Sequence, residues 1–147
     1  MTSATTLTWR NKVALAVSIW LWYARIRYRL RRGDLNTVVA GLASDDSSRQ
    51  TPVEPRRLGK AVARCLPFSL SRATCLPKSL TLFRLLHEQG DEPELVIGLP
   101  AEPRNHVAHA WIELNGTDIG PPPGGRLHEP LARYRRGARV PTPTDRS

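Results

Sequence analysis

The spacing of apolar residues changes once along this chain, close to residue 90, and this change limits the folds that the chain can adopt. Before that point apolar residues recur at helical spacing, and after it they alternate as in a strand. Helices are predicted at 8–32, 35–43, 56–66 and 75–89, and strands at 94–99, 107–114 and 117–120. This order predicts an α+β fold, with N-terminal helices and one further helix packed on a small antiparallel sheet.

The segment 75–89 has the most regular helical pattern. Apolar side chains recur on one face, namely Leu76, Leu80, Phe83 and Leu86. Polar side chains line the opposite face, namely Lys78, Thr81, Arg84 and Glu88. Pro77 falls in the first turn, where its missing N–H is tolerated, and Gly90 supplies a left-handed stop. We therefore expect a helix that begins at Cys75.

The strand at 107–114 alternates between two faces, with His109, Trp111 and Glu113 together on one of them. Asn115-Gly116, which follows directly, is the strongest short signal for a hairpin turn. A two-residue turn at this point pairs Asp118 with Glu113. The segment 121–125, rich in proline and glycine, is expected to end the regular structure.

The length of 147 residues favours one domain, and a hydrophobic content of 40% is enough for a modest core. We expect this domain to occupy residues 1–135, with a helical part and a loop at 1–55 and a core at 56–120. The basic, proline-rich segment 136–147 is expected to be a disordered tail. Two cysteines are too few for a disulfide scaffold or a four-cysteine zinc site, which favours a cytoplasmic protein.

The longest apolar run, Val13–Ala24, carries no charge and follows two basic residues, as in a signal peptide. However, no small-residue cleavage site follows it, and its helical length of ~18 Å is short of the ~30 Å hydrocarbon core of a membrane. We therefore expect a buried helix that continues as an arginine-rich amphipathic one. A signal peptide or a membrane anchor is the alternative.

The chain is basic, with 22 Lys and Arg against 13 Asp and Glu and a net charge of +9. The basic residues gather in the segments 25–32, 56–64 and 133–139. This charge suits a solvated surface, an acidic peptide or protein partner, an anionic membrane surface or nucleic acid. Few aromatic residues stand among the arginines and no nucleic-acid-binding motif is present, so nucleic acid is not expected as a partner. Membrane association is not expected either.

Cys75 and His109 are the strongest candidates for chemistry. A cysteine at the start of a helix meets free backbone N–H groups and the helix dipole, which lower the pKa of its thiol. A histidine on a following strand completes the arrangement that cysteine hydrolases use. Each residue alone also has a structural explanation, as a small core residue for Cys75 and a buried, hydrogen-bonded imidazole for His109.

The remaining candidates have simpler explanations. We expect Cys65 to lie in the core and Glu113 to make polar contacts across the strands. His87 and His128 are expected to be solvated. His106 and His109 lie three residues apart and would point to opposite faces of a strand, so no metal site is expected. Trp111 either lines a substrate cleft or packs in the core.

Three blocks of the sequence resemble the transglutaminase-like superfamily, namely Thr74–Leu80 (TCLPKSL), Leu95–Gly98 (LVIG) and His109–Gly116 (HAWIELNG). Their order and spacing resemble the lasso-peptide leader peptidases, the stand-alone protease half of the lasso B protein. The resemblance covers residues 56–120, and the N-terminal helix and the length of the chain also fit.

The resemblance implies a transglutaminase-like or papain-like core with a Cys–His–Asp arrangement. Carried over by motif position, Cys75 is the nucleophile, His109 is the general base and acid, and Trp111 is taken to bind substrate. The family places its acid about a dozen residues after the histidine, where this chain has Pro121. Asp118 is the nearest acid and is taken as the orienting residue, although regular pairing leaves it on the order of 13 Å from His109.

The resemblance also implies a function and its partners. The chain would be a cysteine peptidase that removes the leader from a ribosomally made precursor peptide, without a cofactor. Its partners would be that precursor, at the junction of leader and core, a leader-recognition protein and an ATP-dependent lasso cyclase. Two other functions stay open, a transglutaminase-like amidase or acyl transferase with another substrate, and a non-catalytic basic adaptor.

Overall fold

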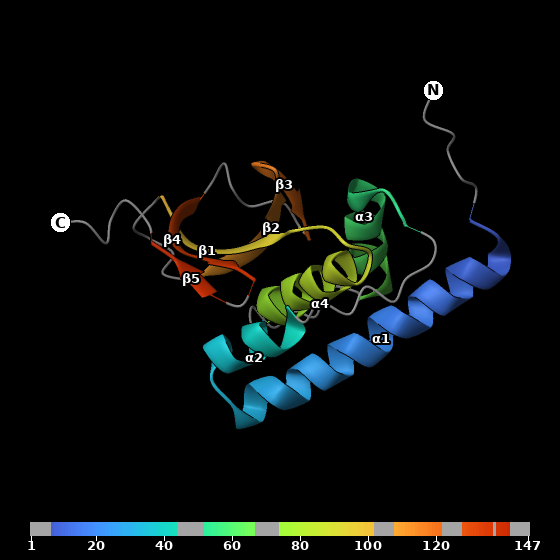
Figure 1. The fold of residues 1–147 in the computed structure, drawn as a ribbon, viewed down its shortest axis with the longest axis horizontal. Coiled ribbons are helices and arrows are strands. Elements are labelled where there is room, and N and C mark those ends of the chain that lie inside the picture. The colour runs from blue at the N-terminus through green and yellow to red at the C-terminus, as the bar shows by residue number, and fades with distance from the viewer. Residues whose placement is uncertain are drawn as a thin grey trace.

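The computed structural model describes residues 7–43, 52–66, 74–101, 108–121, 128–136 and 138–141. Within these residues, four helices precede a five-stranded sheet (Figure 1). The elements are α1 (Trp9–Arg32), α2 (Leu35–Leu42), α3 (Pro55–Cys65), α4 (Cys75–Glu88), β1 (Glu94–Pro100), β2 (His109–Leu114), β3 (Thr117–Gly120), β4 (His128–Arg135) and β5 (Ala138–Val140). This order confirms the predicted α+β fold.

The strands form one antiparallel sheet in the order β3-β2-β1-β4-β5. A tight turn joins β2 to β3 at Asn115 and Gly116, whose φ angles are 52° and 77°. These left-handed angles are what an Asn-Gly hairpin turn requires. Glu113 pairs with Asp118, as a two-residue turn predicts, and a bulge shifts the register directly beyond this pair.

Regular structure continues past the segment 121–125, where the sequence pattern predicts that it ends. β4 pairs with the side of β1 that β2 leaves free, and β5 pairs with β4. β5 lies within the segment 136–147 that is expected to be a tail, and residues 142–147 lie outside the described residues.

β4 alternates apolar and charged residues, and its arginines give it the composition of a solvated segment. Tyr134 and Ala132 alternate with two arginines, and both belong to or pack against the core. Arg133 and Arg135 form ion pairs with Glu94 of β1. Because these arginines pair across the sheet, a segment that has the composition of a solvated basic tail forms a strand instead.

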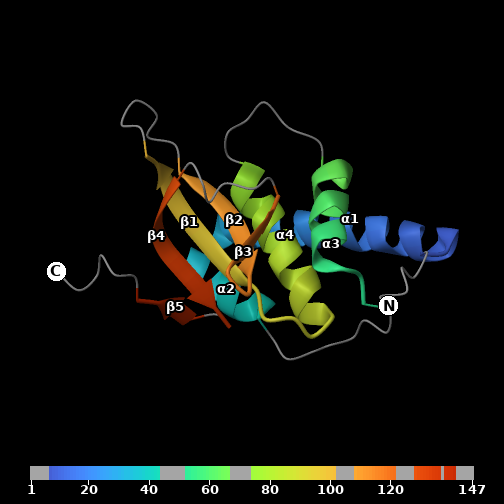
Figure 2. The same cartoon turned by 90° about the horizontal axis from the view of Figure 1, so that it is seen from above.

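α4 lies at the centre of the molecule, between the sheet and the other helices (Figures 1 and 2). Its polar face is therefore buried, with Arg84 6% and Glu88 8% exposed. Arg84 donates hydrogen bonds to Glu88 at 3.3 Å and to the carbonyl oxygen of Leu42 in α2 at 3.2 Å. Trp22 of α1 donates to Glu88 at 2.8 Å, and its ring lies 4.7 Å from the Arg84 guanidinium. The polar face thus connects α4 to α1 and α2.

The sheet buries side chains on both of its faces. Leu95, Ala110 and Ile112 belong to the main core, which the helices complete. Val96 and Trp111 alternate with these residues along β1 and β2, so they point to the opposite face, and both are fully buried there. α4 therefore rests on one face of β2 while a smaller buried cluster forms on the other.

α1 is less buried than the sequence pattern predicts. Among its residues, all of them described, only Ile19 and Ile26 are buried. Its N-terminal half extends past the other elements (Figure 1) and exposes large apolar side chains, namely Trp9, Val13, Val17, Trp20 and Leu21. In the part of the chain that the structure describes, no helix has both the length and the apolar character needed to cross a membrane.

Candidate active site

Cys75 is the first residue of α4, as predicted. Backbone N–H groups in the first turn of a helix have no partner within the helix, so they favour a negative charge at this position. The thiol is half-buried, and its Sγ lies 4.0 Å from the carbonyl oxygen of Ala108, next to the start of β2. One turn further along α4, the Ser79 hydroxyl donates to the carbonyl oxygen of Ala110 at 2.9 Å. These contacts hold the N-terminal end of α4, which carries Cys75, against the start of β2.

His109, the first residue of β2, reaches the thiol. Its imidazole is hydrogen-bonded to the Cys75 side chain. The structure therefore brings together the two residues that the sequence singles out, from a helix start and a strand start. This is the geometry in which an imidazole can take a proton from a thiol or return it.

The net effect of the surroundings is to lower the pKa of the Cys75 thiol below its ordinary value. Burial acts in the opposite direction and raises this pKa, since a thiolate is poorly solvated there. The hydrogen bond and the charge of His109, together with backbone hydrogen bonds at Ala110 and Leu76, outweigh burial. The site thus gives Cys75 a larger fraction of thiolate, the reactive form, than an ordinary cysteine has.

Lys78 is a further charged group beside the thiol, and the sequence motifs do not single it out for chemistry. It follows Cys75 by three residues, so the two side chains share one face of α4. Its side chain is almost fully buried, with 4% exposed. Burial lowers the pKa of the Lys78 ammonium, and the negative charge of the Cys75 thiolate raises it in part. The spacing of three residues is the signal by which sequence alone could identify it.

Three aromatic rings gather where β2 and β4 begin. The centroid of His109 lies 4.9 Å from that of His128 and 6.0 Å from that of Trp111. His128 is therefore half-buried against His109 and not in a solvated position as predicted. Trp111 is fully buried, so in this structure it packs against His109 and His128 and offers no exposed surface to a substrate.

Glu113 binds the indole N–H of Trp111 and is itself bound by Arg133. Trp111 donates from Nε1 to Glu113 at 3.0 Å, and Arg133 donates to the other carboxylate oxygen at 2.7 Å. Glu113 thus makes cross-strand polar contacts, as predicted from the sequence. The pair anchors the indole ring on which His109 rests.

Asp118 lies on β3 opposite Glu113, four positions along β2 from His109. Its carboxylate accepts a hydrogen bond from the backbone N–H of Gly120 at 2.9 Å. Its role as the orienting acid stays a prediction.

The other candidates lie apart from this pair. Cys65 ends α3, packs against the core and, like Cys75, is a free thiol. His87 is half-buried, with its ring 4.5 Å from that of Phe83, where a solvated position was predicted. His106 lies outside the described residues. Among those that are described, no cluster of three or more His, Cys, Asp and Glu is suited to a metal ion.

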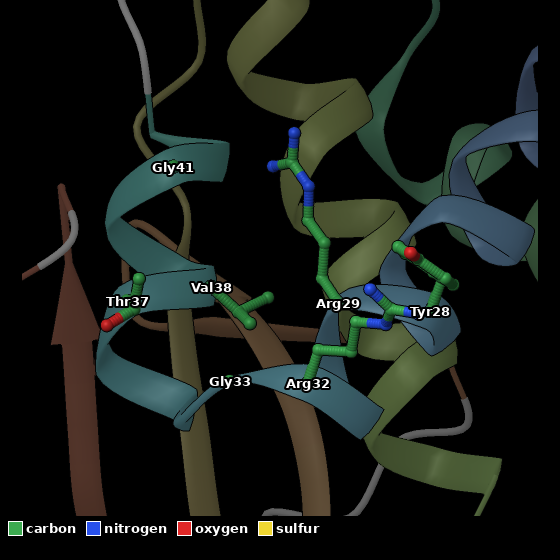
Figure 3. Close-up of a pocket in the computed structure, with 7 residues that line it drawn as sticks. All are labelled: Tyr28, Arg29, Arg32, Gly33, Thr37, Val38 and Gly41. Carbon is green, nitrogen blue, oxygen red and sulfur yellow. The ribbon is translucent and has the colours of Figure 1, made fainter.

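A pocket of about 370 Å³ lies away from this site, where α1 ends and α2 begins (Figure 3). Its lining consists of Tyr28, Arg29, Arg32, Gly33, Thr37, Val38 and Gly41. The Arg32 guanidinium lies 4.7 Å from the centroid of the Tyr28 ring. None of the lining residues belongs to the pair formed by Cys75 and His109.

Compared with known protein families, residues 13–135 match the transglutaminase-like superfamily. The match spans most of the chain, and the chain belongs to this superfamily. Its members are generally cysteine proteases or transferases, in agreement with a hydrogen-bonded cysteine and histidine at the start of a helix and of a strand. No curated protein and no solved structure matches the chain at a significant level.

Proposed function

We propose that the chain is a cysteine peptidase that removes the leader from a ribosomally made precursor peptide during lasso-peptide maturation. The observation that carries this proposal is the hydrogen bond between the Cys75 side chain, at the start of α4, and the His109 imidazole, at the start of β2. This contact also helps to lower the pKa of the thiol. Membership of the transglutaminase-like superfamily supports cysteine-based acyl chemistry. The precursor as substrate rests on the resemblance of the three sequence blocks to lasso-peptide leader peptidases.

The first half of the reaction forms an acyl-enzyme. The Cys75 thiolate attacks the carbonyl carbon of the scissile peptide bond, and the developing oxyanion accepts a hydrogen bond from backbone N–H groups at the start of α4. The imidazolium of His109 then protonates the departing amine, and the C–N bond breaks. A thioester between Cys75 and the leader remains, while the core peptide leaves with a free amine.

The second half regenerates the enzyme. The imidazole of His109, now neutral, takes a proton from water, and the hydroxide attacks the thioester carbonyl. The C–S bond breaks, the leader leaves as a carboxylic acid that loses its proton to the solvent, and the thiolate–imidazolium pair is restored. No oxidant, metal or cofactor enters either half of this reaction. Asp118 is the acid that the resemblance assigns to orient His109.

The surface supports recognition of the substrate together with a partner protein. The net charge of +9 favours acidic partners. The exposed apolar side chains on the N-terminal half of α1 form a surface on which a leader-recognition protein can dock. In this proposal the freed core amine passes to an ATP-dependent lasso cyclase, and the reaction takes place in the cytoplasm.

Cleavage of the cognate precursor, in the presence of the leader-recognition protein, tests this function. The wild-type chain and the matched control Cys65→Ala should release leader and core, while Cys75→Ala should release neither and keep its thermal stability. Cleavage by Cys75→Ala would contradict the proposal. An absence of cleavage by the wild-type chain would favour the basic adaptor.

The mass of the leader product separates hydrolysis from acyl transfer, which the transglutaminase-like family also supports. Hydrolysis leaves a leader with a free carboxylate, heavier by one water than the corresponding acyl group. Transfer to an added primary amine leaves an amide in its place. An amide as the main product would show that the activity is acyl transfer and not peptide hydrolysis, with the same Cys75 and His109.

A further inference from the structure

His109 and His128 meet across a strand that separates them. β1 lies between β2, which carries His109, and β4, which begins at His128. Strands once removed in a sheet are about 9.6 Å apart, at ~4.8 Å per step, so their side chains do not ordinarily touch. Here the two imidazole centroids are 4.9 Å apart.

The contact is possible because Gly98 stands on β1 between them. Gly98 pairs with His109 on one side and with Pro130 of β4 on the other. A Cβ at this position would come within 2.8 Å of the Trp111 ring and 2.6 Å of the Glu129 carbonyl oxygen. The middle strand therefore has no side chain at the point where the rings from the two outer strands meet.

The rings of His109, His128 and Trp111 form a triangle with sides of 4.9, 6.0 and 6.0 Å. Trp111 is itself held by Glu113, so it provides a rigid side to this triangle. His109 is thus in contact with two rings on its own side of the sheet and with the Cys75 thiol of α4. Removing the ring of His128 would take away one of the contacts that hold the imidazole in its orientation.

We propose that His128 is a positioning residue, which fixes the ring plane of His109 and so keeps its imidazole directed at Cys75. The proposal rests on the proposed cysteine-based function, in which His109 must exchange a proton with the thiol and then with the leaving amine. In nucleophilic sites of this kind the base is oriented by a third group. In this chain the ring of His128 adds support by contact, besides the acid that orients the base, and its effect is exerted through His109.

Substitution of His128 in the full-length chain tests this assignment. His128→Ala removes the ring, and His128→Phe keeps a flat ring of similar width in the same place. The readout is the rate at which iodoacetamide alkylates Cys75, followed by peptide mass spectrometry. We expect His128→Ala to slow this rate about tenfold, because small misplacements of reacting groups are costly. His128→Phe should recover most of it.

The NMR signal of the His109 ring provides a spectroscopic readout. Ring currents from Trp111 and His128 shift it in the wild-type chain, so we expect it to move in His128→Ala and to return toward its position in His128→Phe. Leu131→Ala is the matched control, since Leu131 lies on the same strand with 44% of its surface exposed. It should change neither the alkylation rate nor the His109 signal.

The outcomes distinguish this inference from the proposed function. Wild-type alkylation rates and an unmoved His109 signal in His128→Ala would overturn the positioning role, while the pair of Cys75 and His109 would stand. A slow rate that His128→Phe does not recover would also overturn it, because it would indicate a loss of general packing. Failure of precursor cleavage with the expected alkylation pattern would instead overturn the substrate and leave the positioning role in place.

Discussion

Gly98 lies against the indole ring of Trp111, so that a Cβ on Gly98 would come within 2.8 Å of Trp111 Cη2. The same position faces the Glu129 carbonyl oxygen, from which a Cβ would be only 2.6 Å away. Neither neighbour is the free end of a flexible side chain, since one is a buried indole and the other is backbone. The site is therefore closed to any larger residue at this point in β1.

We predict that Gly98→Ala destabilises the protein and weakens the site together. Overpacking of this kind costs about 1–3 kcal/mol of unfolding free energy, measurable by urea denaturation. Alkylation of Cys75 should slow as well, because the displaced indole no longer supports His109. The control is Gly33→Ala, where a Cβ would meet only an ordinary contact at 3.5 Å. Equal unfolding free energies for the two variants would contradict this prediction, because they would show that a Cβ fits at position 98 without strain.

Because Arg84 and Glu88 form a buried ion pair, we predict that removing one partner lowers the unfolding free energy strongly. Arg84→Ala leaves the Glu88 carboxylate buried with the indole N–H of Trp22 and without the guanidinium. Breaking a buried pair costs about 3–5 kcal/mol of unfolding free energy. Arg135→Ala is the matched control, since the side chain of Arg135 is 57% exposed and exposed pairs contribute about 1 kcal/mol or less. Similar unfolding free energies for both variants would contradict the buried role of α4's polar face.

Much of the fold follows from local patterns in the sequence. The change of apolar period near residue 90 predicts α4 and then β1, and Asn115-Gly116 predicts the β2–β3 turn and the register opposite Glu113. β4 could not be predicted in this way, because Arg133 and Arg135 are satisfied by ion pairs with β1 that form only in the folded sheet.

In the candidate site, too, residues marked by local patterns could be predicted, and contacts that form only on folding could not. Cys75 and His109 could be predicted from local patterns. A cysteine at the start of a helix has a lowered pKa, and a histidine on a following strand completes the order found in cysteine hydrolases. The neighbourhood of His128 could not be predicted, because its contact with His109 depends on the pairing of β4 with β1 and on Gly98 between them. The burial of Lys78 depends likewise on how the elements pack around α4.

Lys78→Met tests the contribution of the buried ammonium to the thiolate. Methionine preserves most of the buried volume while removing the positive charge that interacts with Cys75. We expect the pKa of Cys75 to rise and its alkylation at neutral pH to slow by a few-fold, about the size of one partly buried charge interaction. Lys60→Met, on the exposed side of α3, is the matched control and should leave the rate unchanged. A rate in Lys78→Met equal to that of the wild-type chain would remove Lys78 from the site.

The pH dependence of Cys75 alkylation, compared between the wild-type chain and His109→Gln, tests the central claim most directly. In the wild-type chain the rate should reach half of its maximum below the ordinary pKa of a cysteine, because His109 lowers the pKa of the thiol. In His109→Gln the midpoint should move to higher pH, since burial remains and raises the pKa while the lowering effect of His109 is lost. Coincident profiles for the two proteins would contradict the account, because they would show that His109 does not act on the thiol.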